Sequence, residues 1–176
     1  MARPTHSRAL SVWANGERVG VWRLPARGPM EFCYDATWID SPAGRPLSLS
    51  LPFMPGNIAH KGPRVLNYFD NLLPDSDIIR KRIAQRYRTE TLDAFDLLQA
   101  IGRDCVGAVQ LLPEDDAPVG VDRIEGTPLT DAEIETMLTR TVSAPALGAT
   151  DEIDDFRISL AGAQEKTALV AFLRAL

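Results

Sequence analysis

The residues with the clearest chemical potential form a run of mostly small side chains near the carboxyl-terminal end, Ala161-Gly162-Ala163-Gln164-Glu165-Lys166. Small residues between two expected strands let backbone N–H groups approach an anion, and successive unpaired N–H groups can form a concave nest for phosphate oxygens. Lys166 or Arg157 would add positive charge. The spacing matches neither the Walker motif nor the glycine-rich loop of ordinary protein kinases, so a plain hairpin turn is the alternative.

Ser159 lies two residues before this run. Its hydroxyl could be a phosphorylation site. The alternative is an ordinary strand residue that faces water, and the residue type alone does not separate the two.

A cluster of cations is the second candidate, on a helix expected from about Ser76 to Arg88. Apolar residues at Ile79, Ile83 and Tyr87 define one face of that helix. The cations are Arg80, Lys81, Arg82, Arg86 and Arg88. They could contact nucleic acid or an acidic protein surface. The alternatives are a solvated face or pairing with acidic residues of the same chain, and no interleaved aromatic residues suggest base stacking.

Other chemistries have little support. The chain has only two histidines, His6 and His60, and two cysteines, Cys33 and Cys105. These numbers disfavour a zinc site, a disulfide framework and a serine–histidine–aspartate set, and two buried, reduced thiols are expected. The carboxylates beside the cationic helix are explained most simply by turns and helix caps, namely Asp70, Asp75 and Asp77.

The elements expected to position these groups begin with strands. Two β-rich runs, 10–13 and 18–22, flank Asn15-Gly16, which is typical of a two-residue hairpin turn. A third strand is expected at 30–34. In 45–52 leucine alternates with serine, which predicts a short strand with three leucines on one face and two hydroxyls on the other.

Helices are expected at 65–73, 76–88 and 92–101, the last ending at Gly102 as a natural left-handed cap. A strand follows at 106–112 and then an acidic loop to residue 128. Thr130 and Glu133 form a capping-box pattern that opens another helix. Two strands, 156–160 and 166–173, flank the candidate phosphate loop.

Composition places the chain among ordinary globular proteins of one domain or slightly more. It has 176 residues, 45% hydrophobic and 24% charged. No apolar run spans a bilayer and no signal peptide is evident, so a cytoplasmic location is expected. The net charge of −5 hides an asymmetry, because residues 1–90 carry 13 basic and 8 acidic side chains and residues 91–176 carry 6 and 16. This pattern fits internal complementarity or a basic face kept for an acidic partner.

Several strings together resemble one family. They are RPLSLSLP (45–52), FDNLLPDS (69–76), FDLLQAIGRDCVGAVQLLP (95–113) and DFRISLAGAQEKTAL (155–169). The chain resembles the N-terminal part of a HipA-type serine/threonine kinase, the toxin of a type II toxin–antitoxin pair. The resemblance implies an α+β fold: a β-rich subdomain with helices at 1–112, and at 113–176 the start of the kinase core with a hairpin carrying the phosphate loop.

The resemblance also implies roles for individual residues. The stretch from Ala161 to Lys166, including Gly162, Ala163, Gln164 and Glu165, would cover the phosphates of ATP, which the intact kinase holds with Mg²⁺. The serine that matches Ser159 is autophosphorylated in the family, which displaces the loop and silences the kinase. Implied partners are a HipB-like DNA-binding antitoxin and a protein substrate such as an aminoacyl-tRNA synthetase, with bacterial persistence as the outcome.

One departure limits the expected activity. In the family, the ATP-contacting lysine and the catalytic and metal-binding aspartates lie beyond the point that matches Leu176. Because phosphoryl transfer needs a metal-held charge and a positioned base, we expect an inactive, truncated kinase fragment with weak or absent ATP binding. The alternative is a non-catalytic interaction module that binds or restrains a separate HipA-like kinase or antitoxin. Direct nucleic-acid binding ranks third because the net charge is negative.

Overall fold

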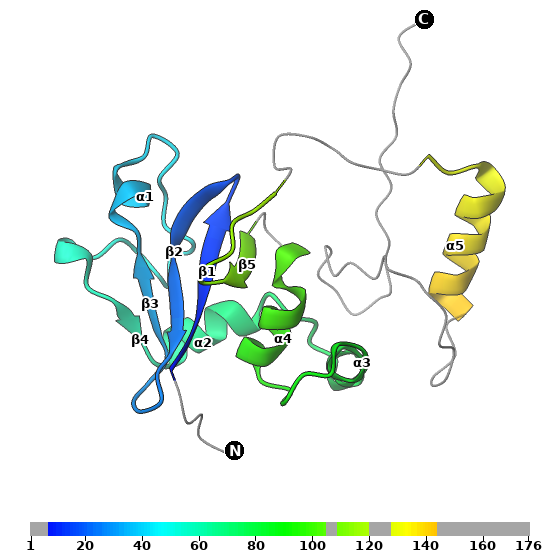
Figure 1. The fold of residues 1–176 in the computed structure, drawn as a ribbon, viewed down its shortest axis with the longest axis horizontal. Helices are drawn as coiled ribbons and strands as arrows, with labels where there is room; N and C mark the ends of the chain where they lie inside the picture. Colours follow the sequence, from blue (N-terminus) through cyan, green and yellow to red (C-terminus); the bar gives the residue numbers. More distant parts are fainter. Residues whose placement is uncertain (1–6, 105–108, 120–127, 144–176) are drawn as a thin grey trace, which may run out of the picture.

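A computed structural model describes residues 7–104, 109–119 and 128–143 of the chain (Figure 1). The chain opens with the hairpin expected from Asn15-Gly16, formed by β1 (Arg8–Ala14) and β2 (Glu17–Leu24). Asn15 and Gly16 have φ angles of 50° and 82°. These positive values are what a type I′ turn requires, so the hairpin prediction is confirmed.

Five antiparallel strands form one sheet in the order β4-β3-β2-β1-β5. The expected third strand is β3 (Glu31–Tyr34), the outer strand β4 is His60–Lys61, and β5 (Val109–Pro113) pairs with β1 on the opposite side. Strand β5 therefore lies beside β1, and the described residues have the expected α+β organisation. No helix in the described ranges is both long enough and apolar enough to cross a bilayer.

The four predicted helices are present with shifted ends, and the structure adds α1 (Ala36–Asp40), which the sequence did not predict. The others are α2 (Pro63–Asp70), α3 (Asp77–Tyr87), α4 (Ala94–Ile101) and α5 (Asp131–Ser143), with short 3-10 turns η1 (Pro55–Asn57) and η2 (Gly102–Asp104). The capping box of α5 is confirmed, because the Thr130 backbone N–H donates to Glu133 at 2.7 Å and the Glu133 N–H donates to the Thr130 hydroxyl at 3.3 Å. The hydrogen bonds that the Thr130 backbone N–H and the Thr130 hydroxyl donate to the Glu133 carboxylate lower the pKa of Glu133.

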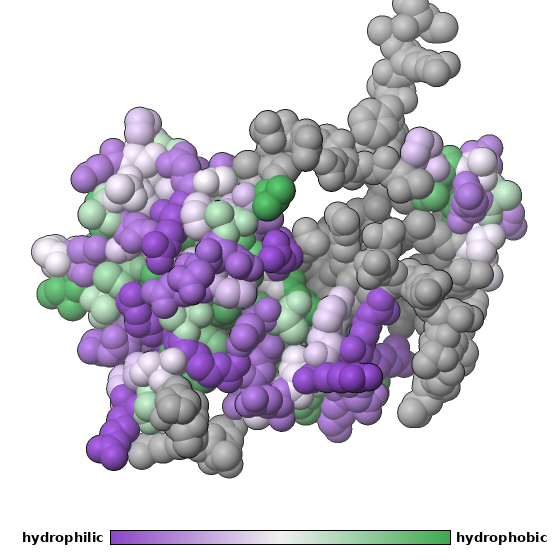
Figure 2. All heavy atoms as spheres, viewed as in Figure 1, coloured by the Kyte–Doolittle hydropathy of each residue, from purple (hydrophilic) through white to green (hydrophobic). Residues whose placement is uncertain are grey.

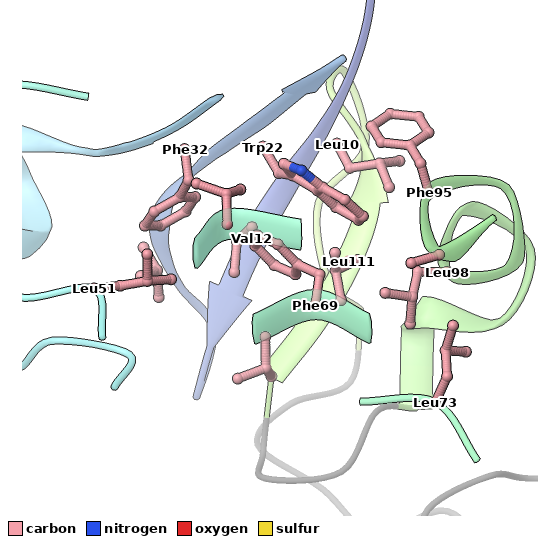
Figure 3. Close-up of a cluster of buried hydrophobic side chains, with 14 of the residues drawn as sticks. Leu10, Val12, Trp22, Phe32, Leu51, Phe69, Leu73, Phe95, Leu98 and Leu111 are labelled. Atoms are coloured by element: carbon pink, nitrogen blue, oxygen red, sulfur yellow. The ribbon is translucent and has the colours of Figure 1, made fainter. Parts of the chain in front are cut away.

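The core lies between the sheet and helices α2 and α4. Trp22 of β2 stacks on Phe69 of α2 with a centroid distance of 4.1 Å and an interplanar angle of 9°, and it meets Phe95 of α4 at 4.8 Å. Figure 3 shows these rings together with Leu10, Leu98 and others between the strands and the helices. All of these side chains are almost fully buried, so three elements distant in sequence are joined by one aromatic cluster.

Gly102 has a different role from the one predicted. Its φ of −68° and ψ of −2° are right-handed, so it is not the left-handed cap that the sequence suggested. A Cβ at this position would lie 2.7 Å from the Leu111 side chain. Glycine is therefore required because the end of α4 packs directly against β5, which is a tertiary contact that the local sequence does not reveal.

The predicted strand at 45–52 is wrong. Ser48 and Leu51 form only an isolated bridge, and the chain turns tightly between them. As a result the leucines do not share a face: Leu51 is fully buried, Leu47 is half-buried and Leu49 is fully exposed. Serine hydroxyls close the turn, since the Ser48 hydroxyl accepts from the Ser50 backbone N–H at 3.0 Å.

Tyr34 holds this turn against the sheet. Its hydroxyl donates to the Leu51 carbonyl at 2.5 Å and accepts from the Leu47 backbone N–H at 2.7 Å. His60 Nε2 hydrogen-bonds the Pro52 carbonyl at 2.8 Å, and the Asn57 side chain donates to the Tyr34 carbonyl at 2.7 Å. The 47–58 loop, defined as residues 47–58, is thus fixed by buried groups of β3 and β4 rather than by its own regular structure.

We expect Tyr34→Phe to lower the free energy of unfolding by about 1–3 kcal/mol at neutral pH, because it leaves the Leu51 carbonyl and the Leu47 N–H without their partner. Burial raises the pKa of Tyr34 from 10.0 to about 12. Since the folded state holds this proton more tightly, its contribution is complete below about pH 10 and is lost as the pH rises towards 12.

Urea unfolding at pH 8, 10 and 11.5 measures the cost of the substitution and its dependence on pH. Tyr34→Phe retains all the other ionisable groups, so the difference between the two proteins reports on the Tyr34 hydroxyl alone. The wild type should lose up to about 2–3 kcal/mol more than Tyr34→Phe between about pH 10 and 12. Equal losses in both proteins would contradict the role of this hydroxyl.

Candidate interaction surfaces

The residues predicted to bind ATP phosphates, 161–166, lie outside the described residues, as do Arg157 and the predicted phosphosite Ser159. These assignments remain predictions, as does the domain boundary between residues 112 and 113. In the described part of the chain no group of three or more histidine, cysteine, aspartate or glutamate side chains is placed to hold a metal ion. The structure instead provides two exposed surfaces with contrasting chemistry.

The first surface is on α3. Ile83 is buried, and Ile79 and Ala84 pack against the core, so one side of the helix is used for attachment. Lys81, Arg82, Arg86 and Arg88 are exposed on the rest of the helix. We call these four residues the cationic face of α3.

Arg80 does not belong to the cationic face, although the sequence grouped it with the other cations. Its guanidinium binds the Asp70 carboxylate at 2.7 Å and the Pro74 carbonyl at 2.7 Å, and it is only 15% exposed. The hydrogen bond with Asp70 is the main reason that the pKa of Arg80 is raised. Arg80 therefore links the end of α2 to the start of α3, and Asp70 is a structural ion-pair partner rather than a turn residue.

The remaining cations have different surroundings. Arg86 lies over the ring of the neighbouring Tyr87, with 5.9 Å between the guanidinium carbon and the ring centroid. Arg88 ends the helix in the left-handed conformation with a φ of 53°. Positive charge at the carboxyl end of a helix interacts favourably with the helix dipole, so part of this charge stabilises α3 itself.

A second ion pair connects the sheet to α4. Arg8 of β1 binds Asp96 at 2.6 Å, and the Thr91 hydroxyl donates to the other carboxylate oxygen at 2.5 Å. Asp96 is 7% exposed and Arg8 also lies 4.8 Å above the Phe95 ring. Asp96 Oδ1 is buried and has the Arg8 ion pair without a hydrogen bond of regular geometry, while Oδ2 accepts from Thr91. A paired, buried carboxylate that joins β1 to α4 indicates a structural role.

The second surface is the outer side of the 47–58 loop. Leu49 is fully exposed, Ile58 is 63% exposed and Met54 is 37% exposed. No residue from 46 to 59 carries a charge. Figure 2 shows hydrophobic atoms at the left edge of a mostly hydrophilic face, where Figure 1 draws this part of the chain. Because the loop is fixed by its buried groups, Leu49 and Ile58 are held in positions that are mostly exposed to solvent.

Cys33 lies beneath the same loop and is half-buried, so the expectation of two buried thiols holds only in part. Its sulfur is 3.8 Å from the Asn57 carbonyl oxygen. Cys105 lies outside the described residues.

Mutations distinguish the structural role of Arg80 from that of the exposed cations of α3. We expect Arg80→Ala to lower the free energy of unfolding by about 1.5–3 kcal/mol, because it removes charge-assisted hydrogen bonds to Asp70 and Pro74. Lys81→Ala is the matched control on the neighbouring, exposed position and should change it by less than about 0.5 kcal/mol. Thermal or urea unfolding measures both, and equal effects would contradict the division.

Comparison with known proteins agrees with the architecture described here. Residues 10–112 match the family model of the HipA N-terminal domain. Over 166 residues the chain is 35% identical to "Putative kinase Y4mE" of Sinorhizobium fredii, and the match covers 93% of this chain and 38% of that protein. The chain thus spans less than two fifths of the length of this curated relative. Since the matched domain runs from β1 to β5 and includes α2, α3 and α4, the chain belongs to the HipA N-terminal domain family.

Proposed function

We propose that this chain is the N-terminal part of a HipA-like serine/threonine kinase, in which residues 161–166 hold the phosphates of ATP. The observation that carries the proposal is the extent of the likeness to the kinase-named relative. It covers 93% of the chain and therefore reaches well past residue 112, into the segment that contains the candidate loop. The family model covers residues 10–112, and the likeness to the relative also covers most of the segment that follows.

The proposed chemistry rests on the residues of the loop. Ala161, Gly162 and Ala163 have side chains small enough for backbone N–H groups to approach phosphate oxygens, and Lys166 would add a positive charge. ATP would supply the transferable phosphoryl group and Mg²⁺ the charge neutralisation. Because the described residues contain no cluster of three or more histidine, cysteine, aspartate or glutamate side chains placed to hold a metal ion, we assign no Mg²⁺ ligand among them.

Ser159 would regulate the loop through charge. A phosphate on this hydroxyl carries about −1.5 to −2 charges at neutral pH, two residues from Ala161. It would repel the phosphates of ATP and compete for the same N–H donors. A HipB-like antitoxin and an aminoacyl-tRNA synthetase substrate, in the cytoplasm, belong to the same proposal and concern the intact kinase.

The loop assignment predicts weak binding of ATP that depends on Gly162. Titration of the 176-residue chain with a fluorescent ATP analogue should give binding in the millimolar range, lost in Gly162→Val because a branched side chain blocks the approach of the phosphates. Gly148→Val, also outside the described residues, is the matched control and should bind like the wild type. Ser159→Asp should weaken binding and Ser159→Ala should not.

Two outcomes would contradict the proposal. If inorganic triphosphate does not displace the bound ATP analogue, the analogue is not held by its phosphates, which contradicts the phosphate nest. Phosphoryl transfer from labelled ATP by these 176 residues alone would contradict the inference that catalysis needs groups supplied elsewhere in the kinase.

A second function is favoured by the exposed side of the 47–58 loop. A fixed, uncharged surface with Leu49 and Ile58 in water is typical of a protein contact site. The chain would then be a non-catalytic module that binds and restrains a separate HipA-like kinase. The two functions differ in what they require, because restraint needs this surface and does not need residues 161–166.

The test of this second function uses the purified relative named "Putative kinase Y4mE". We expect the chain to bind it and slow its autophosphorylation, and Leu49→Asp combined with Ile58→Asp to weaken binding at least about tenfold by placing charge in an apolar contact. Val119→Asp, at a position that is 82% exposed elsewhere, is the control. Unchanged binding by the double variant would exclude this surface.

A further inference from the structure

The cationic face of α3 has a chemical counterpart in the chain itself. Residues 151–155, with the sequence DEIDD, hold four carboxylates in five positions. They lie outside the described residues, and they belong to the half of the chain with 16 acidic and 6 basic side chains. The cationic face belongs to the half with the opposite balance.

We propose that the cationic face of α3 binds the acidic segment 151–155 of the same chain. The most accessible donors are Lys81 and Arg88, which are exposed. Arg82 and Arg86 already make contacts within the fold and would add charge rather than new hydrogen bonds. Several carboxylates facing several cations are needed, because a single exposed ion pair contributes little.

Tethering favours the chain's own segment over a nucleic acid. A segment of the same polypeptide is present at an effective concentration in the millimolar range, so weak electrostatic attraction is enough to populate the contact. Nucleic acid must instead approach a protein of net charge −5.

The proposed contact has a consequence for the segment that follows. Residue 155 is four positions before Ser159 and six before Ala161. Binding of 151–155 on α3 would therefore bring the start of the candidate loop next to the N-terminal domain. The contact itself needs neither ATP nor a phosphate nest, so it can fail or succeed independently of the proposed function.

Zero-length cross-linking with a carbodiimide tests the contact, because the chain has only three lysines, Lys61, Lys81 and Lys166. We expect a link from Lys81 to one of the carboxylates in 151–155, found by mass spectrometry. Lys61 lies 2.7 Å from Glu31 and should link to it in every sample, which reports an intact fold. A link from Lys81 to Asp77, one helical turn away, is the second internal control.

The link to 151–155 should be lost at about 1 M NaCl, where the screening length is about 3 Å. It should also be lost in Arg86→Gln combined with Arg88→Gln, which keeps Lys81 available to react. Neutralising Glu114, Asp115 and Asp116 to their amides is the matched control on another acidic run and should leave the link unchanged. A mixture of unlabelled and isotope-labelled chains separates contacts within one chain from contacts between chains.

Three outcomes would overturn the proposal. Lys81 could link only to Asp77, or its links could join two different copies of the chain. The third is salt-dependent binding of a short labelled DNA duplex that is lost in the Arg86 and Arg88 variant while no link to 151–155 forms, which would assign the face to nucleic acid.

Discussion

The burial of Trp22 is the interaction on which the rest of the described structure depends. Its ring lies in parallel on Phe69 and at an angle to Phe95, so one side chain of the sheet contacts both covering helices. The indole N–H has no hydrogen-bond partner in the described residues. Burying such a donor is unfavourable, and the arrangement persists because the aromatic packing more than offsets that cost. The sheet and helices α2 and α4 are therefore held as one unit.

The two candidate surfaces follow from how this core is completed. The 47–58 loop contributes Leu51 to the core and is fixed by Tyr34, which leaves Leu49 and Ile58 with no interior position. Helix α3 contributes Ile83 and is linked to α2 through Arg80 and Asp70. Each segment is attached by a few buried groups, and its other side chains are left exposed to solvent.

Local patterns predicted the parts of the fold in which local chemistry decides the structure. Asn15-Gly16 and the Thr130–Glu133 capping box were read correctly because turn geometry and caps involve neighbouring residues. The alternating leucines at 45–52 were misread as a strand because the phenol that bends this segment is supplied by Tyr34, more than ten positions earlier. Gly102 ends α4 as predicted, but the reason for a glycine there is its neighbour Leu111, which the sheet brings close.

The sequence alone also does not distinguish Arg80, which is a structural cation, from the exposed cations of α3. Arg80 directly precedes Lys81 and Arg82 in the sequence, and its contact with Asp70 at the end of α2 shows that its role differs from theirs. The apolar surface on the 47–58 loop was missed because its leucines looked like core residues. A useful signal was available: the whole stretch from 46 to 59 lacks charge, in a chain where 24% of residues are charged.

Phosphorylation of Ser159 would affect both the proposed phosphate loop and the proposed contact on α3. A phosphate on Ser159 adds negative charge close to both the loop at 161–166 and the acidic segment at 151–155. At the loop this charge opposes the phosphates of ATP, whereas on α3 it increases attraction to the cationic face. The same modification would then disfavour nucleotide and favour docking. Because linked equilibria are reciprocal, docking of the acidic segment would in turn favour the phosphorylated chain in the form without nucleotide.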